Sequence, residues 1–198
     1  MSSVLKKAFF AAALAALAAP AFSQSSSPAP VIDQRKENQQ DRIANGAQSG
    51  QLTVGETANL EKKESALNKE ENRMEKRDDG NLTAADKARL TRQQNHLSNQ
   101  IYRDKHNARV QNTNPKSEVG QRQRNQQERI AQGVKSGQLT AGETAHLEKR
   151  EAAINKEVKT ERAANGGKLT PAERRQVNRQ ENRTSAAIYR KKHNARTQ

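Results

Sequence analysis

The side chains best suited to binding chemistry stand in two nearly identical segments, at residues 102–109 and 189–196. In each segment a tyrosine precedes a histidine by four residues, so the two rings share one face of a helix. Lysines and arginines surround both pairs, and such a face could form a recognition edge or contact a metal. The candidate binding residues are Tyr102, Lys105, His106, Arg109, Tyr189, Arg190, Lys191, Lys192, His193 and Arg196.

The alternative interpretation of these segments is structural. The tyrosine would pack the third helix of a unit onto the core, while the histidine, lysine and arginine side chains interact with the negative end of the helix dipole. We expect this structural role, because no second ligand stands at the spacing that a zinc site requires.

A second pattern, G-x-L-T-x-x-[E/D], occurs four times and predicts joints between helices. The glycine tolerates the left-handed conformation that ends one helix, and the threonine caps the next. The acid can reach back to the backbone N–H of the threonine, which completes a capping box. The residues expected in these structural roles are Gly50, Thr53, Glu56, Gly80, Thr83, Asp86, Gly137, Thr140, Glu143, Gly167, Thr170 and Glu173.

The same pattern resembles the downstream half of an EF-hand loop, whose closing acid binds calcium. The upstream half departs from that family, because the opening ligand position holds Asn45, Glu75, Gln132 or Arg162. Calcium takes about six to eight oxygen ligands, and only the loop around Asp79 and Asp86 offers more than one acid. We therefore expect helix caps and no metal site, with a degenerate EF-hand-like, metal-responsive protein as an alternative.

The joints belong to a tandem duplication. Residues 34–111 align without a gap with residues 121–198, and 43 of the 78 aligned pairs are identical. Between the joints the chain is rich in strong helix formers, which predicts an all-α protein of two tandem three-helix units joined by Gly/Thr-capped turns. We expect helices near residues 34–48, 54–78, 84–108, 121–135, 141–165 and 171–195.

The predicted helices are long and exposed around a thin core. Their apolar residues form narrow stripes at Leu60, Leu67 and Met74 and at Leu90, Leu97 and Ile101. Cysteine is absent, so no disulfide can compensate. A catalytic carboxylate pair needs a pocket that shifts its pKa values, and we expect this composition to wall off none. The sequence therefore predicts neither enzyme activity nor a cofactor.

The N-terminal segment predicts export. Lys6 and Lys7 precede an apolar run from Ala8 to Ala19, and small residues lead to a cleavage site after Ser23. The run is too short to cross a bilayer, which takes about 20 residues. We expect a signal peptide at 1–23, a mobile Ser/Pro-rich leader at 24–32, a first repeat at 33–111, a mobile linker at 112–119 and a second repeat at 120–198. The protein would be periplasmic or secreted, without a transmembrane span after cleavage.

Charge is unevenly divided between the repeats. The formal net charge of the chain is +14, and residues 33–111 carry 15 Lys and Arg against 13 Asp and Glu. Residues 121–198 carry 18 against 8. The basic second half predicts an acidic protein, an acidic polysaccharide or lipid head groups as partner. We do not expect cytoplasmic nucleic acid, because the chain is exported and has one tyrosine per repeat for stacking. The narrow seams would also be consistent with a homodimer.

The Leu-Thr pair of the joints, in an exported, basic, cysteine-free helical chain, resembles the LTxxQ periplasmic chaperone family of the Spy and CpxP type. The matching segments are Leu52–Glu56, Leu82–Asp86, Leu139–Glu143 and Leu169–Glu173, with an acid where the family has Gln. The resemblance implies helices paired into a thin cradle for unfolded clients. The functional hypothesis is thus a binding protein with a chaperone-like or envelope-protective role, and a structural helical spacer is an alternative.

Overall fold

The computed structural model describes residues 28–111 and 116–196, so the predicted signal peptide lies outside the described residues. Within these ranges the chain forms six α-helices and no strand, which confirms the all-α prediction. The helices are α1 (Pro28–Ser49), α2 (Val54–Arg77), α3 (Ala84–Lys105), α4 (Glu118–Lys135), α5 (Ala141–Ala164) and α6 (Pro171–Lys192).

Two helices begin earlier than the sequence predicts. Helix α1 starts at Pro28, inside the segment expected to be a mobile leader, because Ile32 is buried against Met74, Leu82 and Leu90. Helix α4 starts at Glu118, inside the expected linker, and Ser117 caps it by accepting a hydrogen bond from the backbone N–H of Gly120 at 3.1 Å. Packing against the neighbouring helices therefore orders residues that polarity alone assigns to loops.

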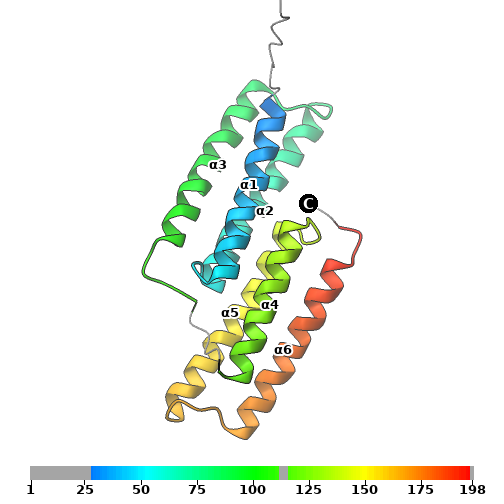
Figure 1. Ribbon diagram of the computed structural model, residues 1–198. Helices are drawn as coiled ribbons and strands as arrows, with labels where there is room; N and C mark the ends of the chain where they lie inside the picture. Colours follow the sequence, from blue (N-terminus) through cyan, green and yellow to red (C-terminus); the bar gives the residue numbers. More distant parts are fainter. Residues whose placement is uncertain (1–27, 112–115, 197–198) are drawn as a thin grey trace, which may run out of the picture.

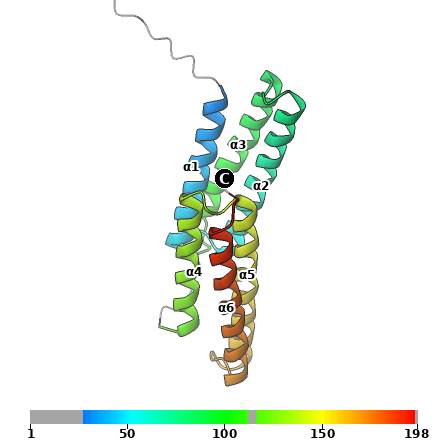
Figure 2. The same ribbon diagram turned by 90° about the vertical axis from the view of Figure 1, so that its right-hand side faces the viewer.

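The halves of the chain lie one beyond the other along the long axis of the molecule. Figure 1 shows α1–α3 above and α4–α6 below, with α1 beside α4 at mid-height and with α3 and α6 on opposite sides. In Figure 2 α6 faces the viewer and α3 lies behind. The halves meet through α2 with α5 and through α1 with α4. Because equivalent helices face each other, the arrangement approximates a two-fold axis. On the outer surface Lys135 donates to Gln48, its own counterpart in the first repeat, at 3.0 Å.

Each joint has the local geometry that its residue types favour. The glycines adopt positive φ angles of 75°, 84°, 69° and 89° at residues 50, 80, 137 and 167. Complete capping boxes follow at Thr53, Thr83, Thr140 and Thr170, each with the acid three residues later. The turns between helices within each half are thus specified locally.

The apolar core is divided into four small clusters rather than one. In the first half Ile43, Leu52, Leu60 and Ile101 are almost fully buried together. Their counterparts in the second half, Ile130, Leu139, Leu147 and Ile188, form the equivalent cluster. Between these clusters, where the halves meet, buried polar side chains take the place of a continuous apolar core.

Candidate binding surface

The two tyrosines are on the surface, so the expectation that they pack the third helix onto the core is wrong. Tyr102 is 60% exposed and Tyr189 is 59% exposed. The preceding isoleucines, Ile101 and Ile188, are fully buried and hold α3 and α6 in place. Adjacent helical residues point about 100° apart, which directs the tyrosine rings away from the core.

Each tyrosine stacks on the histidine that follows it by four residues. The ring centroids are 4.2 Å apart for Tyr102 with His106 and for Tyr189 with His193. The Nδ1 atoms of the histidines lie 2.6 Å and 2.7 Å from the carbonyl oxygens of the same tyrosines. A carbonyl can only accept, so Nδ1 carries the proton and caps a carbonyl at the helix end.

The residues after the histidine tie the end of the third helix to the start of the second. Asn107 donates to Glu56 at 2.8 Å, and Asn194 donates to Glu143 at 2.7 Å, each from side chain to side chain. Burial acts to raise the pKa of Glu143, but hydrogen bonds from Asn194 and Thr140 outweigh it and lower the pKa. The capping glutamate therefore fastens two helix ends as an anion.

Two of the predicted binding cations lie where the end of the third helix meets the start of the second helix, a junction that we call the corner of each half. Arg109 lies 3.9 Å from Glu56, and Lys191 lies 3.6 Å from Glu143. Lys105 and Lys192 are half-buried, while Arg190 and Arg196 are exposed. The repeated Lys-His-Asn-Ala-Arg segment is thus largely structural, which leaves the outward tyrosine and the neighbouring exposed arginines for binding.

The exposed face of α6 carries a row of arginines that the sequence analysis did not single out. At about 100° per residue, Arg175, Arg179, Arg183 and Arg190 fall within a sector of about 80°. All four are exposed, and none lies within ion-pair distance of a carboxylate in the described part of the chain. The row is about 22 Å long and ends beside Tyr189. We call these four residues the arginine row.

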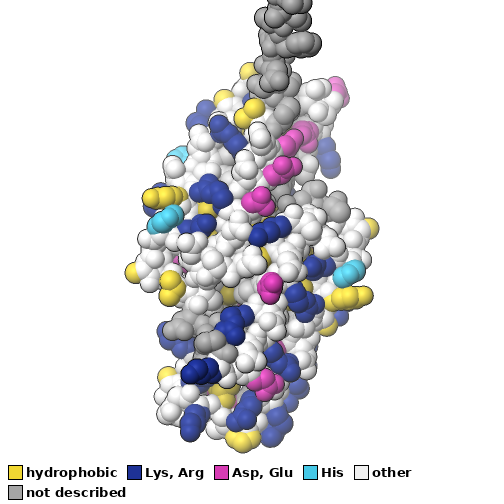
Figure 3. Space-filling model, viewed as in Figure 1, with side chains coloured by type: hydrophobic (Ala, Val, Ile, Leu, Met, Phe, Trp, Pro, Cys, Tyr) yellow, Lys and Arg dark blue, Asp and Glu magenta, His cyan; other side chains and the backbone are white. Residues whose placement is uncertain are grey.

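The equivalent face of α3 is much less basic. The positions that correspond to the arginine row hold Ala88, Arg92, His96 and Arg103. Figure 3 shows one side of the molecule, on which many Lys and Arg side chains lie over the lower part, formed by α4, α5 and α6. A spacing of four residues between 175, 179 and 183 was the sequence signal for this surface.

The first repeat pairs more of its cations internally. Lys36 lies 2.6 Å from Glu71, Arg89 lies 2.7 Å from Glu70, and Arg77 binds Asp86 at 2.9 Å. The Arg77–Asp86 contact argues against the calcium alternative. Asp86 already accepts hydrogen bonds from Arg77 and, at 2.5 Å, from the Thr83 hydroxyl. Among residues 28–111 and 116–196, no three His, Asp or Glu side chains are grouped as metal ligands.

Buried carboxyl groups were not predicted, since the composition was expected to wall off no pocket that shifts the pKa values of a carboxylate pair. Glu61, Glu64, Glu148, Glu151 and Glu181 are each at most 1% exposed. Burial raises the pKa of Glu64 and of Glu148 to about 8 and that of Glu181 to about 7, and it raises the pKa of Glu61 and Glu151 well above the ordinary value. The composition does enclose carboxyl groups, but they lie between packed helices, and none of the five lines the hollow between α4 and the α5–α6 turn that is described below.

These features define a class: an all-α protein of two similar halves with one strongly cationic helix face. In the part of the chain that the structure describes, no helix is both long enough and apolar enough to cross a membrane. No protein-family model matches the chain, and comparisons with curated proteins and with solved structures gave no match.

Proposed function

We propose that this is an exported, non-enzymatic protein that binds a polyanionic partner through the exposed face of α6. The observation that supports the proposal is the arginine row: four exposed arginines with no carboxylate partner among the described residues, next to an exposed tyrosine. Arginine presents several N–H donors in a planar fork that matches carboxylate, sulfate and phosphate groups. An acidic polysaccharide or the acidic surface of a protein would meet the row along its length.

The arginine row does not serve the stability of the helix. Like charges four residues apart on a helix destabilise it by about 0.2–0.5 kcal/mol per pair. Arg175, Arg179 and Arg183 form two such pairs, and the first repeat avoids them with Ala88 and His96 at the equivalent positions. The arginine row thus lowers the stability of α6, and the first repeat lacks it. A binding role would explain why the second repeat has it.

A chaperone-like action is the second form of this proposal. Tyr102, Tyr189 and Val110 are 60%, 59% and 66% exposed, and exposed rings and apolar side chains can contact an unfolded chain. The resemblance of the joints to the LTxxQ family suggests the same kind of client. On this form of the proposal the arginine row would attract acidic segments of the client.

Binding of residues 24–198 to dextran sulfate and to polyglutamate at low salt tests the proposal. The informative comparison is between two matched double variants, Arg179→Gln with Arg190→Gln and Arg92→Gln with Arg103→Gln, which remove equivalent charges from α6 and α3. We expect the α6 variant to bind at least about tenfold more weakly and the α3 variant to change little.

Two outcomes would overturn the proposal. The first is equal losses in the two double variants, which would show that only total charge matters. The second is an unmodified protein that binds neither polyanion and also fails to suppress the aggregation of an unfolded client. Circular dichroism of each variant shows whether the helices are intact. We expect intact helices, because the substituted side chains are exposed.

A further inference from the structure

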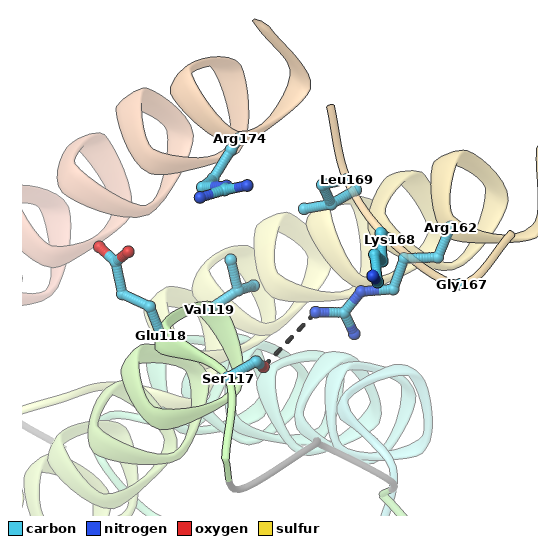
Figure 4. A pocket seen from close by; sticks show the side chains of 8 residues that line it. All are labelled: Ser117, Glu118, Val119, Arg162, Gly167, Lys168, Leu169 and Arg174. Atoms are coloured by element: carbon cyan, nitrogen blue, oxygen red, sulfur yellow. Dashed lines mark hydrogen bonds between the residues drawn. The ribbon is translucent and has the colours of Figure 1, made fainter. Parts of the chain in front are cut away.

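A hollow with a volume of about 380 Å³ lies at the end of the second half, where the start of α4 meets the turn between α5 and α6. Figure 4 shows Val119 and Leu169 between Arg174 on one side and Arg162 and Lys168 on the other. Two apolar side chains thus form the floor, and three cations from separate places in the chain surround it.

The cations of this hollow are largely uncompensated. The Arg162 guanidinium donates to the Ser117 hydroxyl at 3.4 Å, and no carboxylate among the described residues lies within ion-pair distance of Arg162, Lys168 or Arg174. The one acid in the lining is Glu118, which is bound by Arg122 and by Asn178, each at 3.4 Å. The hollow therefore presents three positive charges against one negative charge that is already paired.

The first repeat lacks this arrangement. Its residues at the positions of Arg162 and Lys168 are Glu75 and Asn81, although Leu82 and Ile32 keep the apolar floor. The second repeat thus has two cations where the first has an acid and an amide, Arg174 and Lys87 are cationic in both repeats, and Glu118 stands where the first repeat has Val31. The change is local, since the glycine and the capping threonine of the same joint are identical in the two repeats.

We propose that this hollow binds the phosphate group of a phosphate monoester whose apolar or ring-shaped body rests on Val119 and Leu169. A phosphate monoester carries about −1.5 to −2 charges and three acceptor oxygens, so two arginines and a lysine can share it. A single carboxylate has one charge and would leave most of these donors unused. The Ser117 hydroxyl and the positive end of α4 add to the attraction for a dianion.

This inference rests on the proposed function and names a chemical group that the partner should carry. Arg174 and Arg175 are adjacent at the start of α6 and point about 100° apart, so the hollow lies around the helix from the end of the arginine row. A polyanion that follows the row to the start of α6 and turns around the helix there would place a terminal phosphate in the hollow. The phosphate could belong to a soluble phosphorylated compound or to a lipid head group.

Calorimetric titration of residues 24–198 with phenyl phosphate tests the site, with benzoate as the carboxylate comparison. We expect saturable binding of phenyl phosphate, weaker binding of benzoate, and a loss of about tenfold or more in Arg162→Gln and in Arg174→Gln. The matched control is Lys87→Gln, which removes the first-repeat counterpart of Arg174 and should leave phosphate binding unchanged. Vesicles that contain phosphatidic acid, compared with phosphatidylcholine vesicles, distinguish a lipid source from a soluble one.

A reconstructed site provides the converse test. Glu75→Arg with Asn81→Lys places the second-repeat cations around the first-repeat floor and should double the number of phosphates bound. No saturable phosphate binding, or equal loss in Lys87→Gln and Arg174→Gln, would overturn the inference. If dextran sulfate still binds through the arginine row in that case, the proposed function stands and only the phosphate site fails.

Discussion

Glu61 accepts a hydrogen bond from the side-chain amide of Gln40 at 3.1 Å, and Glu148 accepts the equivalent bond from Gln127 at 2.9 Å. The two contacts are 87 residues apart in the sequence and lie where the halves of the protein meet. Burial is the largest cause of the raised pKa of Glu61, and the nearby Glu64 and Glu148 raise it further. Burial therefore favours the protonated form of both carboxyl groups.

The buried carboxyls predict that stability falls as pH rises above the ordinary glutamate pKa of 4.5. The folded protein retains protons up to about pH 8 at Glu64 and Glu148, whereas the unfolded chain releases them near pH 4.5. The folded state therefore binds more protons in this interval, and each such group lowers the free energy of unfolding by about 1.4 kcal/mol per pH unit. Urea unfolding followed by circular dichroism, from about pH 5 to about pH 8, should show a steadily falling midpoint.

Other charged groups around the cluster set the limits of this effect. Lys36 favours the ionised form of Glu64 and Arg122 favours that of Glu181, while Glu148 and Glu181 disfavour ionisation of Glu151. The capping acids act in the opposite direction. Glu56 and Glu143 have lowered pKa values in the folded protein, so they stabilise it at neutral pH, and this stabilisation is lost only as the pH falls below the ordinary glutamate pKa. A midpoint that stays constant or rises across this interval would contradict the buried, protonated state.

Replacing a buried carboxyl by its neutral amide should remove part of the pH dependence. Glu148→Gln keeps an acceptor for Gln127, so we expect it to raise the free energy of unfolding by up to about 5 kcal/mol above pH 8 and to have little effect near pH 5. Glu37→Gln, at an exposed position, is the control and should leave the pH profile unchanged. The same profile in Glu148→Gln as in the unmodified protein would show that Glu148 is not the titrating group.

The corner between the second and third helices of each half should contribute to stability through its asparagine. Asn194→Ala removes the donor to Glu143, and we expect a loss of about 1–2 kcal/mol in the free energy of unfolding. Asn107→Ala removes the equivalent bond to Glu56 and should cost a similar amount. Guanidinium unfolding measures both, and a cost below about 0.3 kcal/mol in each would show that the corner is held by other contacts.

Gly142 and Gly55 are equivalent in the two repeats but have different surroundings. A Cβ at Gly142 would lie 3.0 Å from the Ser65 hydroxyl, whereas a Cβ at Gly55 would meet nothing within 4 Å. Gly55→Ala should therefore stabilise the protein by up to about 1 kcal/mol through helix propensity, and Gly142→Ala should gain less or lose stability. Ser65→Ala should restore the gain for Gly142→Ala in a double-mutant cycle, because it removes the hydroxyl that the added Cβ would meet. Equal gains without Ser65→Ala would refute the close approach.

The joints were the part of the fold that local sequence could specify. A positive-φ glycine, a capping threonine and an acid three residues later act within seven residues of chain, so their geometry needs no tertiary information. The starts of α1 and α4 could not be predicted in this way. Ile32 and Val119 are the residues that extend these helices, and both are buried against residues of other helices and turns.

The buried glutamates show why the core was harder to predict than the joints. Glu64 stands four residues after Leu60 and three before Leu67, in the register of the apolar stripe, while Glu61 directly follows Leu60, and both glutamates recur in the second repeat. Charge normally places such residues on the outside, and only the approach of the other half of the chain encloses them. The tyrosines were expected to be buried and are exposed. Ile101 and Ile188, the residues before them, already fill the core positions of α3 and α6.

A basic row built into the first repeat should create a second binding surface. Ala88→Arg with His96→Arg would place arginines at all four positions on α3 that correspond to the arginine row. We expect about twice the amount of dextran sulfate bound per protein at saturation, measured by sedimentation or light scattering. No added capacity in a correctly folded variant would indicate that the row on α6 depends on other features of the second half.

The most direct test of α6 as the polyanion-binding surface is the salt dependence of polyanion binding with and without the arginine row. Dextran sulfate affinity is measured from about 50 mM to about 200 mM salt for the unmodified protein and for Arg175→Gln, Arg179→Gln, Arg183→Gln and Arg190→Gln combined. If these four arginines contact the anion, the slope of log affinity against log salt becomes smaller by roughly one for each arginine removed. An unchanged slope, with affinity also unchanged, would contradict the assignment of α6 as the binding surface.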